Sequence, residues 1–538
     1  MPRVRPTIYQ VIHRACSDVL ASEYAQAVFA VVAWVAVTRL PFINADILSV
    51  DESVYLALGA GLNDGLIPYV DIVDRKPIGI YLIYAAADAL FSDPLLGVRL
   101  FGMLATIGTG VMLMQMGRQF LRLSAPVATL SAVLYSGYAL LFYGDAGQTP
   151  VFYMPFVVGG AWLVLREAER LVYGAPPSPA RLAVAGLLLG LSLQIKYSTF
   201  FECIFFGALI LVPAWKARDT FGARGLGVAL AGAGAMLVGG LLPTAIAYAA
   251  YVGLGHADAF VFYNFTANLS REATDFPFSE ILTRAGLFVL ALSPLLVMSV
   301  RQLWQANSAV FERNRPPAWV NHTLVLWFVV ALVGALAQRQ PYATYFFDLL
   351  APLSLLAASA FQHSGRKLRS PELTMRHAAV VVLLPVLSYV GMQAAKYINN
   401  GSRNLPSTIA GDIKEIGVSS MFNFNSFGII HEIAHIGLPS RYPYPDHLLR
   451  DLEARSFQFD AVGEIGRILN ENPDVILVQR PISQKVSADR RDILETKLAA
   501  TYCLWRTYDA GRKQVEAYLH VGSGLKPVQT SCKPVARP

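Results

Sequence analysis

Long apolar blocks recur along this chain and constrain its fold more strongly than any other feature of the sequence. A block of about 17 to 25 apolar residues is long enough to cross the hydrocarbon core of a membrane as a helix. The chain is 54% hydrophobic and only 15% charged, which is typical of a polytopic α-helical membrane protein. Eleven such blocks predict eleven spans, at residues 24–41, 97–116, 124–142, 150–166, 181–195, 198–214, 225–252, 282–301, 319–337, 343–361 and 377–394.

The distribution of Lys and Arg predicts how these spans are oriented. Cytoplasmic loops hold an excess of both residues. If the N-terminus is cytoplasmic, the inner segments carry eighteen Lys and Arg residues and the outer connections carry six. An odd number of spans then places the C-terminal tail on the outer face. The net charge of +7 is spread between the apolar blocks, so we do not expect nucleic-acid binding.

The last part of the chain is polar and carries Pro and Gly at turn-like intervals. It is long enough for one small domain. Residues 473–481 and 515–521 have the pattern of strands, and residues 460–472 have that of an amphipathic helix. We therefore expect a transmembrane domain at residues 1–394 and a small α/β domain on the outer face at residues 395–538.

Two of the four cysteines, Cys503 and Cys532, lie in this expected outer domain. An oxidising compartment would allow them to form a disulfide. The sequence leaves the paired and the unpaired state open.

The segment between the first two spans, residues 42–96, concentrates acids and an Arg-Lys pair in an otherwise apolar chain. It predicts two juxtamembrane helices that lie along the membrane surface. In the first, Ser49 precedes Glu52 by three residues, which is the spacing of a capping box. Asp51 then lies in the first helical turn, where the macrodipole favours an ionised carboxylate. Asp51 is a candidate base with Glu52 beside it, and a purely capping role is the alternative for both acids.

The second helix of this segment is predicted to begin at Pro77, because a missing N–H costs nothing in the first turn. The amides of residues 78–80 are then expected to be free, with Lys76 and Arg75 beside them. A helix N-terminus next to cations is a site for a phosphate. The alternative for Lys76 is a lysine that only extends its ammonium to the membrane surface.

Together these residues resemble the first outer loop of the GT-C membrane glycosyltransferases. The branch concerned contains bacterial relatives of protein O-mannosyltransferases and of the lipopolysaccharide aminoarabinose and galacturonic acid transferases. That branch has an Asp-Glu pair followed by a "DG…PY.D…D.KPPG.Y" pattern. The matching positions here are Asp51-Glu52, Asp64-Gly65, Pro68-Tyr69, Asp71, Asp74, Lys76-Pro77, Gly79 and Tyr81, with Ile78 in place of a second Pro. A later segment, residues 339–353, retains the family's Tyr at Tyr345 but has Thr344 instead of the usual His.

The resemblance implies a GT-C type fold and a glycosyltransferase whose sugar donor is carried on a polyprenyl phosphate. In that mechanism Asp51 takes a proton from an acceptor hydroxyl, the anomeric carbon is inverted, and Lys76 and Arg75 hold the phosphate. Members of the family differ in their acceptors, so an envelope glycan, a lipid and a protein are all candidates. The implied location is the bacterial cytoplasmic (inner) membrane, in contact with its lipids.

The family pattern and the composition of the outer loops also indicate residues that contact donor or acceptor. These residues are Asp145, Tyr345, Arg271 and Tyr55. Asp145 follows the third span, although Gln148 occupies the place where the family more commonly has an acid. Arg271 lies in an aromatic-rich outer segment, where an arginine would bind an anion in a fork. Metal use varies in the family, so no cofactor is predicted and a divalent cation stays an open alternative.

Two other classes of protein fit parts of the sequence. His431-Glu432-x-x-His435 has the HExxH spacing, in which two histidines one helical turn apart bind zinc and the Glu activates water. A membrane-anchored zinc metalloprotease is therefore the rival hypothesis, although a helix is expected to end before Pro439. A transporter would need charged residues at mid-membrane depth, for which Glu202 is the best candidate.

Overall fold

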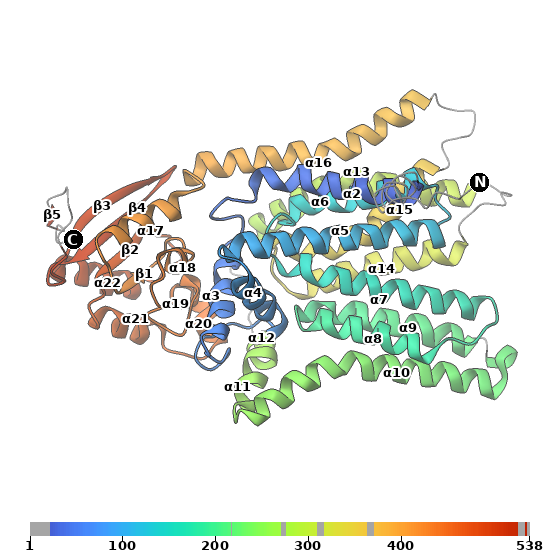
Figure 1. Ribbon diagram of the computed structural model, residues 1–538, viewed down its shortest axis with the longest axis horizontal. Helices are drawn as coiled ribbons and strands as arrows, with labels where there is room; N and C mark the ends of the chain where they lie inside the picture. The colour runs from blue at the N-terminus through green and yellow to red at the C-terminus, as the bar shows by residue number, and fades with distance from the viewer. Residues whose placement is uncertain are drawn as a thin grey trace, which may run out of the picture.

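The computed structural model describes residues 22–216, 218–270, 276–308, 317–362, 371–525 and 533–534. Long helices run side by side in a bundle, and a smaller part that contains a sheet lies at one end of it (Figure 1). The helices α3 (Asp51–Asn63) and α4 (Ile78–Leu90) of the first loop lie between these two parts.

The bundle contains the predicted spans. Its helices are α2 (Glu23–Arg39), α5 (Pro94–Phe120), α6 (Ala125–Ala139), α7 (Thr149–Val172), α8 (Pro179–Leu193), α9 (Phe200–Lys216), α10 (Arg218–Gly253), α13 (Phe278–Ser308), α14 (Ala318–Ala337), α15 (Leu350–Gln362) and α16 (Pro371–Asn400). Shorter turns accompany them: η1 (Leu40–Phe42), η2 (Leu140–Phe142), η3 (Tyr197–Thr199), α11 (Ala257–Val261), η4 (Phe262–Thr266), α12 (Ala267–Leu269) and η5 (Ala343–Leu349).

Within the described residues, nine helices are long and apolar enough to cross a membrane. The other two predicted spans, residues 181–195 and 198–214, are helical as α8 and α9. Their apolar stretches are shorter, at Pro179–Leu193 and Tyr197–Val212, because a polar turn that contains Lys196 separates them. The predicted fold class, a polytopic helical membrane protein of the GT-C type with a small C-terminal α/β part, is confirmed below by structural comparison.

Helix α8 packs against α10 with very close backbone contact. A Cβ added at Gly186 would lie 2.0 Å from the carbonyl oxygen of Met236, and one added at Gly190 would lie 2.3 Å from that of Gly240. Small residues at such a crossing let two helices approach, which is how helices associate within a membrane. The glycines therefore fix α8 in the bundle although its apolar stretch is short.

The C-terminal part is a five-stranded sheet with strand order β1-β2-β4-β3-β5. The strands are β1 (Met421–Asn423), β2 (Val475–Arg480), β3 (Tyr502–Ala510), β4 (Lys513–His520) and β5 (Lys533–Pro534), and the helices are α17 (Leu405–Glu415), α18 (Ile430–Ala434), α19 (Pro445–Leu449), α20 (Asp451–Ser456), α21 (Ala461–Asn470) and α22 (Ala488–Thr501). Alternate residues of a strand face opposite sides of a sheet. Val475 and Leu477 accordingly pack in one apolar layer, with α17 and α18, while Ile476 and Val478 pack in the other, with α21 and α22.

The predicted elements of this part are confirmed as β2, α21 and β4, but β3 and α22 were not predicted. Cys503 in β3 is disulfide-bonded, and Cys532, its expected partner, lies outside the described residues. The predicted division between residues 394 and 395 falls inside α16 and stays a prediction.

Hydrogen bonds join the first loop to the C-terminal part. The amide of Val73 donates to the carbonyl of Arg441 at 2.9 Å. Both the amide and the hydroxyl of Ser407 donate to the Asp46 carboxylate at 2.8 Å. The loop is thus held between the bundle and the C-terminal part.

Both loop helices begin differently from what we expected. The N-cap of α3 is Val50, although the amide of Ser49 still donates to Glu52 at 3.3 Å, which is half of a capping box. Pro77 is the N-cap of α4, and the amide of Gly79 donates to the carbonyl of Gln194 at 2.8 Å. The prediction of free amides at residues 78–80 is therefore wrong at Gly79, because the Gly79 amide is hydrogen-bonded to a backbone carbonyl.

Replacing Gly79 with Ala is expected to destabilise the protein by about 1–3 kcal/mol, because the added Cβ would lie 2.5 Å from the Gln194 carbonyl oxygen and the backbones would have to separate. The thermal unfolding midpoint of the detergent-solubilised protein checks this. The matched control is Gly108→Ala in α5, where nothing lies within 4 Å of the added Cβ. Equal midpoints for the two variants would contradict the close approach.

Candidate active site

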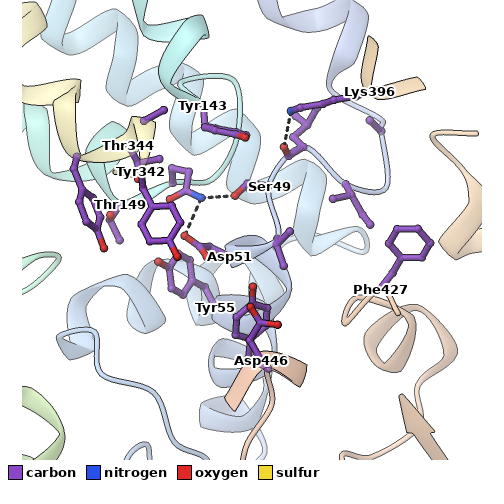
Figure 2. Close-up of a pocket in the computed structure, with 18 of the residues that line it drawn as sticks. Ser49, Asp51, Tyr55, Tyr143, Thr149, Tyr342, Thr344, Lys396, Phe427 and Asp446 are labelled. Atoms are coloured by element: carbon purple, nitrogen blue, oxygen red, sulfur yellow. Dashed lines mark hydrogen bonds between the residues drawn. The ribbon is translucent and has the colours of Figure 1, made fainter. Parts of the chain in front are cut away.

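A cavity of about 550 Å³ lies where the first loop, the bundle and the C-terminal part meet. Its walls come from α3, the segment before α4, the start of α7, η5, the end of α16 and the C-terminal part. Figure 2 shows labelled side chains from α3, α7, η5, α16 and the C-terminal part around one space. Five of the predicted site residues line it: Asp51, Tyr55, Arg75, Lys76 and Tyr345.

Asp51 is placed by the first turn of α3, as predicted, and is partly exposed to the cavity. The amide nitrogen of Gln148 donates to its carboxylate at 3.1 Å and also to the hydroxyl of Ser49 (Figure 2). Gln148 begins α7 as its N-cap, about a hundred residues away in the chain. The contact leaves the carboxylate oriented toward the cavity, where it can accept a proton.

Glu52, in contrast to our expectation, is not among the residues that line the cavity. It is 2% exposed and faces α5, where Arg99 donates to both of its oxygens at 3.1 and 2.9 Å. The amide of Gly147 adds a third hydrogen bond at 2.8 Å. Burial opposes the charge, but Arg99 and these amides outweigh it and lower the pKa of Glu52. Glu52 therefore anchors the start of α3 as a buried anion.

Lys76 and Arg75 both lie in the cavity wall, and the Arg75 side chain contacts the C-terminal part. The Arg75 guanidinium is ion-paired with Glu453 and donates to the Ser456 hydroxyl at 3.2 Å. It also lies 5.3 Å from the centre of the Phe457 ring. As placed, Arg75 is largely neutralised, so Lys76 is the stronger cation of the predicted pair.

Lys196 is a cavity residue that the sequence analysis did not single out. Its ammonium lies 4.2 Å above the centre of the Tyr345 ring, and the residue is only 7% exposed. Burial and the nearby charge of Lys76 lower the pKa of Lys196 to about 7. Its position in the sequence could have indicated a role. Placing a lysine between two apolar membrane blocks costs free energy, and such residues usually have a function.

The remaining predicted contacts divide into three cases. Tyr55 lines the cavity, and in the described part of the structure its hydroxyl has no hydrogen-bond partner. Asp145 is not a lining residue; it accepts hydrogen bonds from Tyr389 and Gln393, and burial raises its pKa. Arg271 lies outside the described residues.

The C-terminal part completes the cavity wall. Tyr444, Asp446, Arg450 and Glu453 all line it, although they lie about four hundred residues from Asp51 in the chain. Sequence reasoning missed them because only tertiary packing brings them to this place. A molecule bound beside Asp51 would therefore touch both parts of the protein.

The HExxH motif does not form a zinc site. Helix α18 has only five residues and ends at Ala434, so His435 lies beyond it with a left-handed φ of 55°. His431 is buried, its Nδ1 lies 3.2 Å from the carbonyl oxygen of Ile436, and burial lowers its pKa to about 4. Among the described residues there is no group of three His, Cys, Asp or Glu that could hold a metal ion. The protease hypothesis is therefore not supported.

Structural comparison defines the fold of the protein. No protein-family model matches the chain. Its fold is that of ArnT from Cupriavidus metallidurans, in the apo state (TM-score 0.60, 14% identity, 91% of this chain and 98% of that chain) and bound to undecaprenyl phosphate (TM-score 0.58, 13% identity, 94% and 100%). The chain thus shares the GT-C type fold of these two structures.

Curated relatives show which proteins the chain is similar to in sequence. The chain is similar to the undecaprenyl phosphate-alpha-4-amino-4-deoxy-L-arabinose arabinosyl transferase of Pseudomonas paraeruginosa PA7, with 25% identity over 340 residues, 60% of this chain and 57% of the relative. The enzyme of the same name from Pseudomonas aeruginosa UCBPP-PA14 is 26% identical over 299 residues, 53% of this chain and 49% of the relative. The chain thus spans about half the length of the curated relatives it matches. The predicted resemblance to aminoarabinose transferases is confirmed, and neither a metalloprotease nor a transporter is supported.

Proposed function

We propose that this protein transfers a sugar from a polyprenyl-phosphate donor to an acceptor hydroxyl at the outer face of the bacterial cytoplasmic membrane. The observation that carries the proposal is the meeting of one carboxylate, Asp51, with two lysines, Lys76 and Lys196, in a single cavity. Similarity to undecaprenyl-phosphate-dependent transferases supports the class of donor. The envelope glycan, lipid or protein that serves as acceptor stays open, as does the sugar.

In this proposal the chemistry is an inverting displacement. Asp51 accepts the proton of the acceptor hydroxyl as its oxygen bonds to the anomeric carbon, and the bond from that carbon to the phosphate oxygen breaks. The polyprenyl phosphate leaves with one more negative charge than it had in the donor. Lys76 and Lys196 stabilise this charge, and such stabilisation is usually the largest contribution to the rate.

The orientation follows the distribution of Lys and Arg described above. The N-terminus is then cytoplasmic, and the cavity and the C-terminal α/β part face the periplasm. This orientation gives the cavity direct access to acceptors of the envelope. A cysteine placed at Ser523, in a turn after β4, should react with a membrane-impermeant maleimide in intact spheroplasts, and failure to react before lysis would contradict the orientation.

The proposal is tested by sugar transfer in proteoliposomes. A panel of radiolabelled polyprenyl-phosphate sugars is offered with an envelope extract as acceptor, with and without EDTA to examine the open question of a divalent cation. Transfer from at least one donor is the expected result. No transfer from any donor, by a protein that binds no polyprenyl phosphate, would overturn the proposal.

Lys76→Gln is expected to raise the KM for the donor by about ten- to a hundredfold, because it removes a charge contact with the phosphate worth about 1.5–3 kcal/mol. The measurement is the dependence of initial rate on donor concentration. Lys513→Gln in β4, a lysine that contacts Gln479 far from the cavity, is the matched control and should keep the KM unchanged. A KM equal to that of the wild type in both variants would remove Lys76 from the phosphate site.

A further inference from the structure

Three segments that lie far apart in the chain meet at the side chain of Asn264, which the proposed chemistry does not use. Asn264 belongs to η4, a π-helical turn, and is 1% exposed. Its side-chain nitrogen donates to the carbonyl of Phe260 at 2.9 Å. Its side-chain oxygen is thereby left to face the other two segments. A single π-helical turn is rare and is frequently found at a functional site.

The first of these two segments carries Lys76. The hydroxyl of Tyr69 donates to the carbonyl of Lys76 at 2.7 Å and lies 3.3 Å from the side-chain oxygen of Asn264. The Tyr69 ring is fully buried and stacks on Tyr263 of the π-helical turn, with 6.1 Å between the ring centres. Lys76 lies in neither a helix nor a strand, and its amide donates to the Tyr81 hydroxyl at 3.1 Å. Side chains, and not a regular backbone pattern, therefore determine where the Lys76 backbone lies.

The other segment carries Lys196. The hydroxyl of Tyr197, the next residue in the chain, donates to the same side-chain oxygen of Asn264 at 3.0 Å. Tyr197 begins η3, the short turn between α8 and α9. The two lysine-bearing segments also meet directly, where the amide of Gly79 donates to the carbonyl of Gln194. One side-chain oxygen thus connects the segments that carry the two cations of the proposed phosphate site.

We propose that Asn264 is a positioning residue that fixes the spacing of Lys76 and Lys196, so that both ammonium groups reach one phosphate. It acts through the hydroxyls of Tyr69 and Tyr197. The inference rests on the proposed function, because it presupposes a phosphate between the two lysines. Like charges repel at short range, so the surrounding structure has to hold the two lysines in place. Asn264 and both tyrosines are not among the residues that line the cavity, so they act through the lysines and not on the substrate.

Removing single hydroxyl groups tests the inference with little change of shape. Tyr69→Phe and Tyr197→Phe keep both rings and delete the hydrogen bonds of one hydroxyl each. Each variant should bind undecaprenyl phosphate about three- to tenfold more weakly, which is the net value of a typical hydrogen bond. Asn264→Leu removes the shared oxygen and should weaken binding by about the same factor. The measurement is binding of undecaprenyl phosphate to the full-length protein in nanodiscs.

A double-mutant cycle separates positioning from two unrelated losses of packing. The two hydroxyls are links in one chain of contacts, so the spacing of the lysines is lost as soon as either link is broken. Tyr69→Phe combined with Tyr197→Phe should therefore bind undecaprenyl phosphate about as weakly as the weaker of the two single variants. Effects that multiply in the double variant would overturn the inference, because they would show that the two tyrosines act independently.

The matched control is Tyr502→Phe in the C-terminal part. Tyr502 is 3% exposed, and its hydroxyl donates to the carbonyl of Pro473 at 2.8 Å. This variant also loses one buried hydrogen bond, so its thermal midpoint should fall about as much as those of Tyr69→Phe and Tyr197→Phe. Its affinity for undecaprenyl phosphate should stay that of the wild type. Equal losses of affinity in all three variants would indicate a general structural effect and would overturn the inference.

Failure of the inference and failure of the proposed function are distinguishable. Wild-type affinity in both Tyr69→Phe and Tyr197→Phe, alongside weaker binding by Lys76→Gln, would overturn the inference and leave the proposed function intact. This comparison holds even if Asn264→Leu does not fold. A wild-type protein that binds no undecaprenyl phosphate would overturn the proposed function, and the inference with it.

Discussion

Replacing Asp51 with Asn is expected to lower the rate of sugar transfer by about 10²- to 10⁴-fold, the usual contribution of a general base. Asn has nearly the same size and can keep the contact with Gln148, but it cannot accept the proton of the acceptor hydroxyl. The effect should therefore fall on kcat, while the affinity for undecaprenyl phosphate stays close to that of the wild type. Initial rates at saturating donor and direct binding measurements check the two halves of this expectation.

The control for Asp51 is Asp64→Asn at the other end of the same helix. Asp64 is exposed and is the C-cap of α3, so its carboxylate has no part in the proposed chemistry. Its variant should transfer sugar at nearly the wild-type rate. A fully active Asp51→Asn protein would refute the assignment of the base, whereas loss of activity in both variants would indicate a defect of the helix.

Replacing Glu52 with Gln is expected to produce the largest loss of stability, about 3–5 kcal/mol, because it leaves the buried Arg99 guanidinium without its counter-charge. Both side chains are 2% exposed, so water cannot replace the lost partner. The expected observation is a clearly lower thermal midpoint and a smaller fraction of monodisperse protein in detergent. The matched control is Glu471→Gln in the exposed pair with Arg467, where a loss of about 0–1 kcal/mol is typical.

A double variant distinguishes a structural from a catalytic role of Glu52. Combining Glu52→Gln with Arg99→Met removes the stranded charge and should recover part of the lost stability. If Glu52→Gln instead unfolds at the wild-type midpoint, binds donor normally and fails to transfer sugar, the structural assignment is wrong and Glu52 is a catalytic residue after all.

The contrast between Asp51 and Glu52 shows where prediction from the sequence ends. The Asp-Glu pair and its place at the start of a helix could be predicted, because capping and dipole rules depend on neighbouring residues. Consecutive helical residues point about 100° apart, so one acid faces the cavity and the other faces α5. Which acid faces which way depends on the position of Arg99, and no local pattern contains that information.

The spans could be predicted well because their signal is local as well. A run of apolar residues of sufficient length identifies a membrane helix almost by itself. The two short helices α8 and α9 lack that length, and their place in the bundle depends instead on packing, such as the contact of Gly186 with α10. Lys196 and Glu453, which share the cavity with Asp51 and Lys76, come from distant segments, and their place beside these residues is visible only in the structure.

The wall that the C-terminal part contributes to the cavity has a consequence for how the cavity can vary. Tyr444, Asp446 and Glu453 belong to the C-terminal part, while Asp51 and Lys76 belong to the first loop. Substitutions in the C-terminal segment at 444–453 would then change one wall of the cavity and leave Asp51 and Lys76 in place. A chimera that exchanges the C-terminal part is best joined in the loop between α16 and α17, where the chain passes from the bundle to that part.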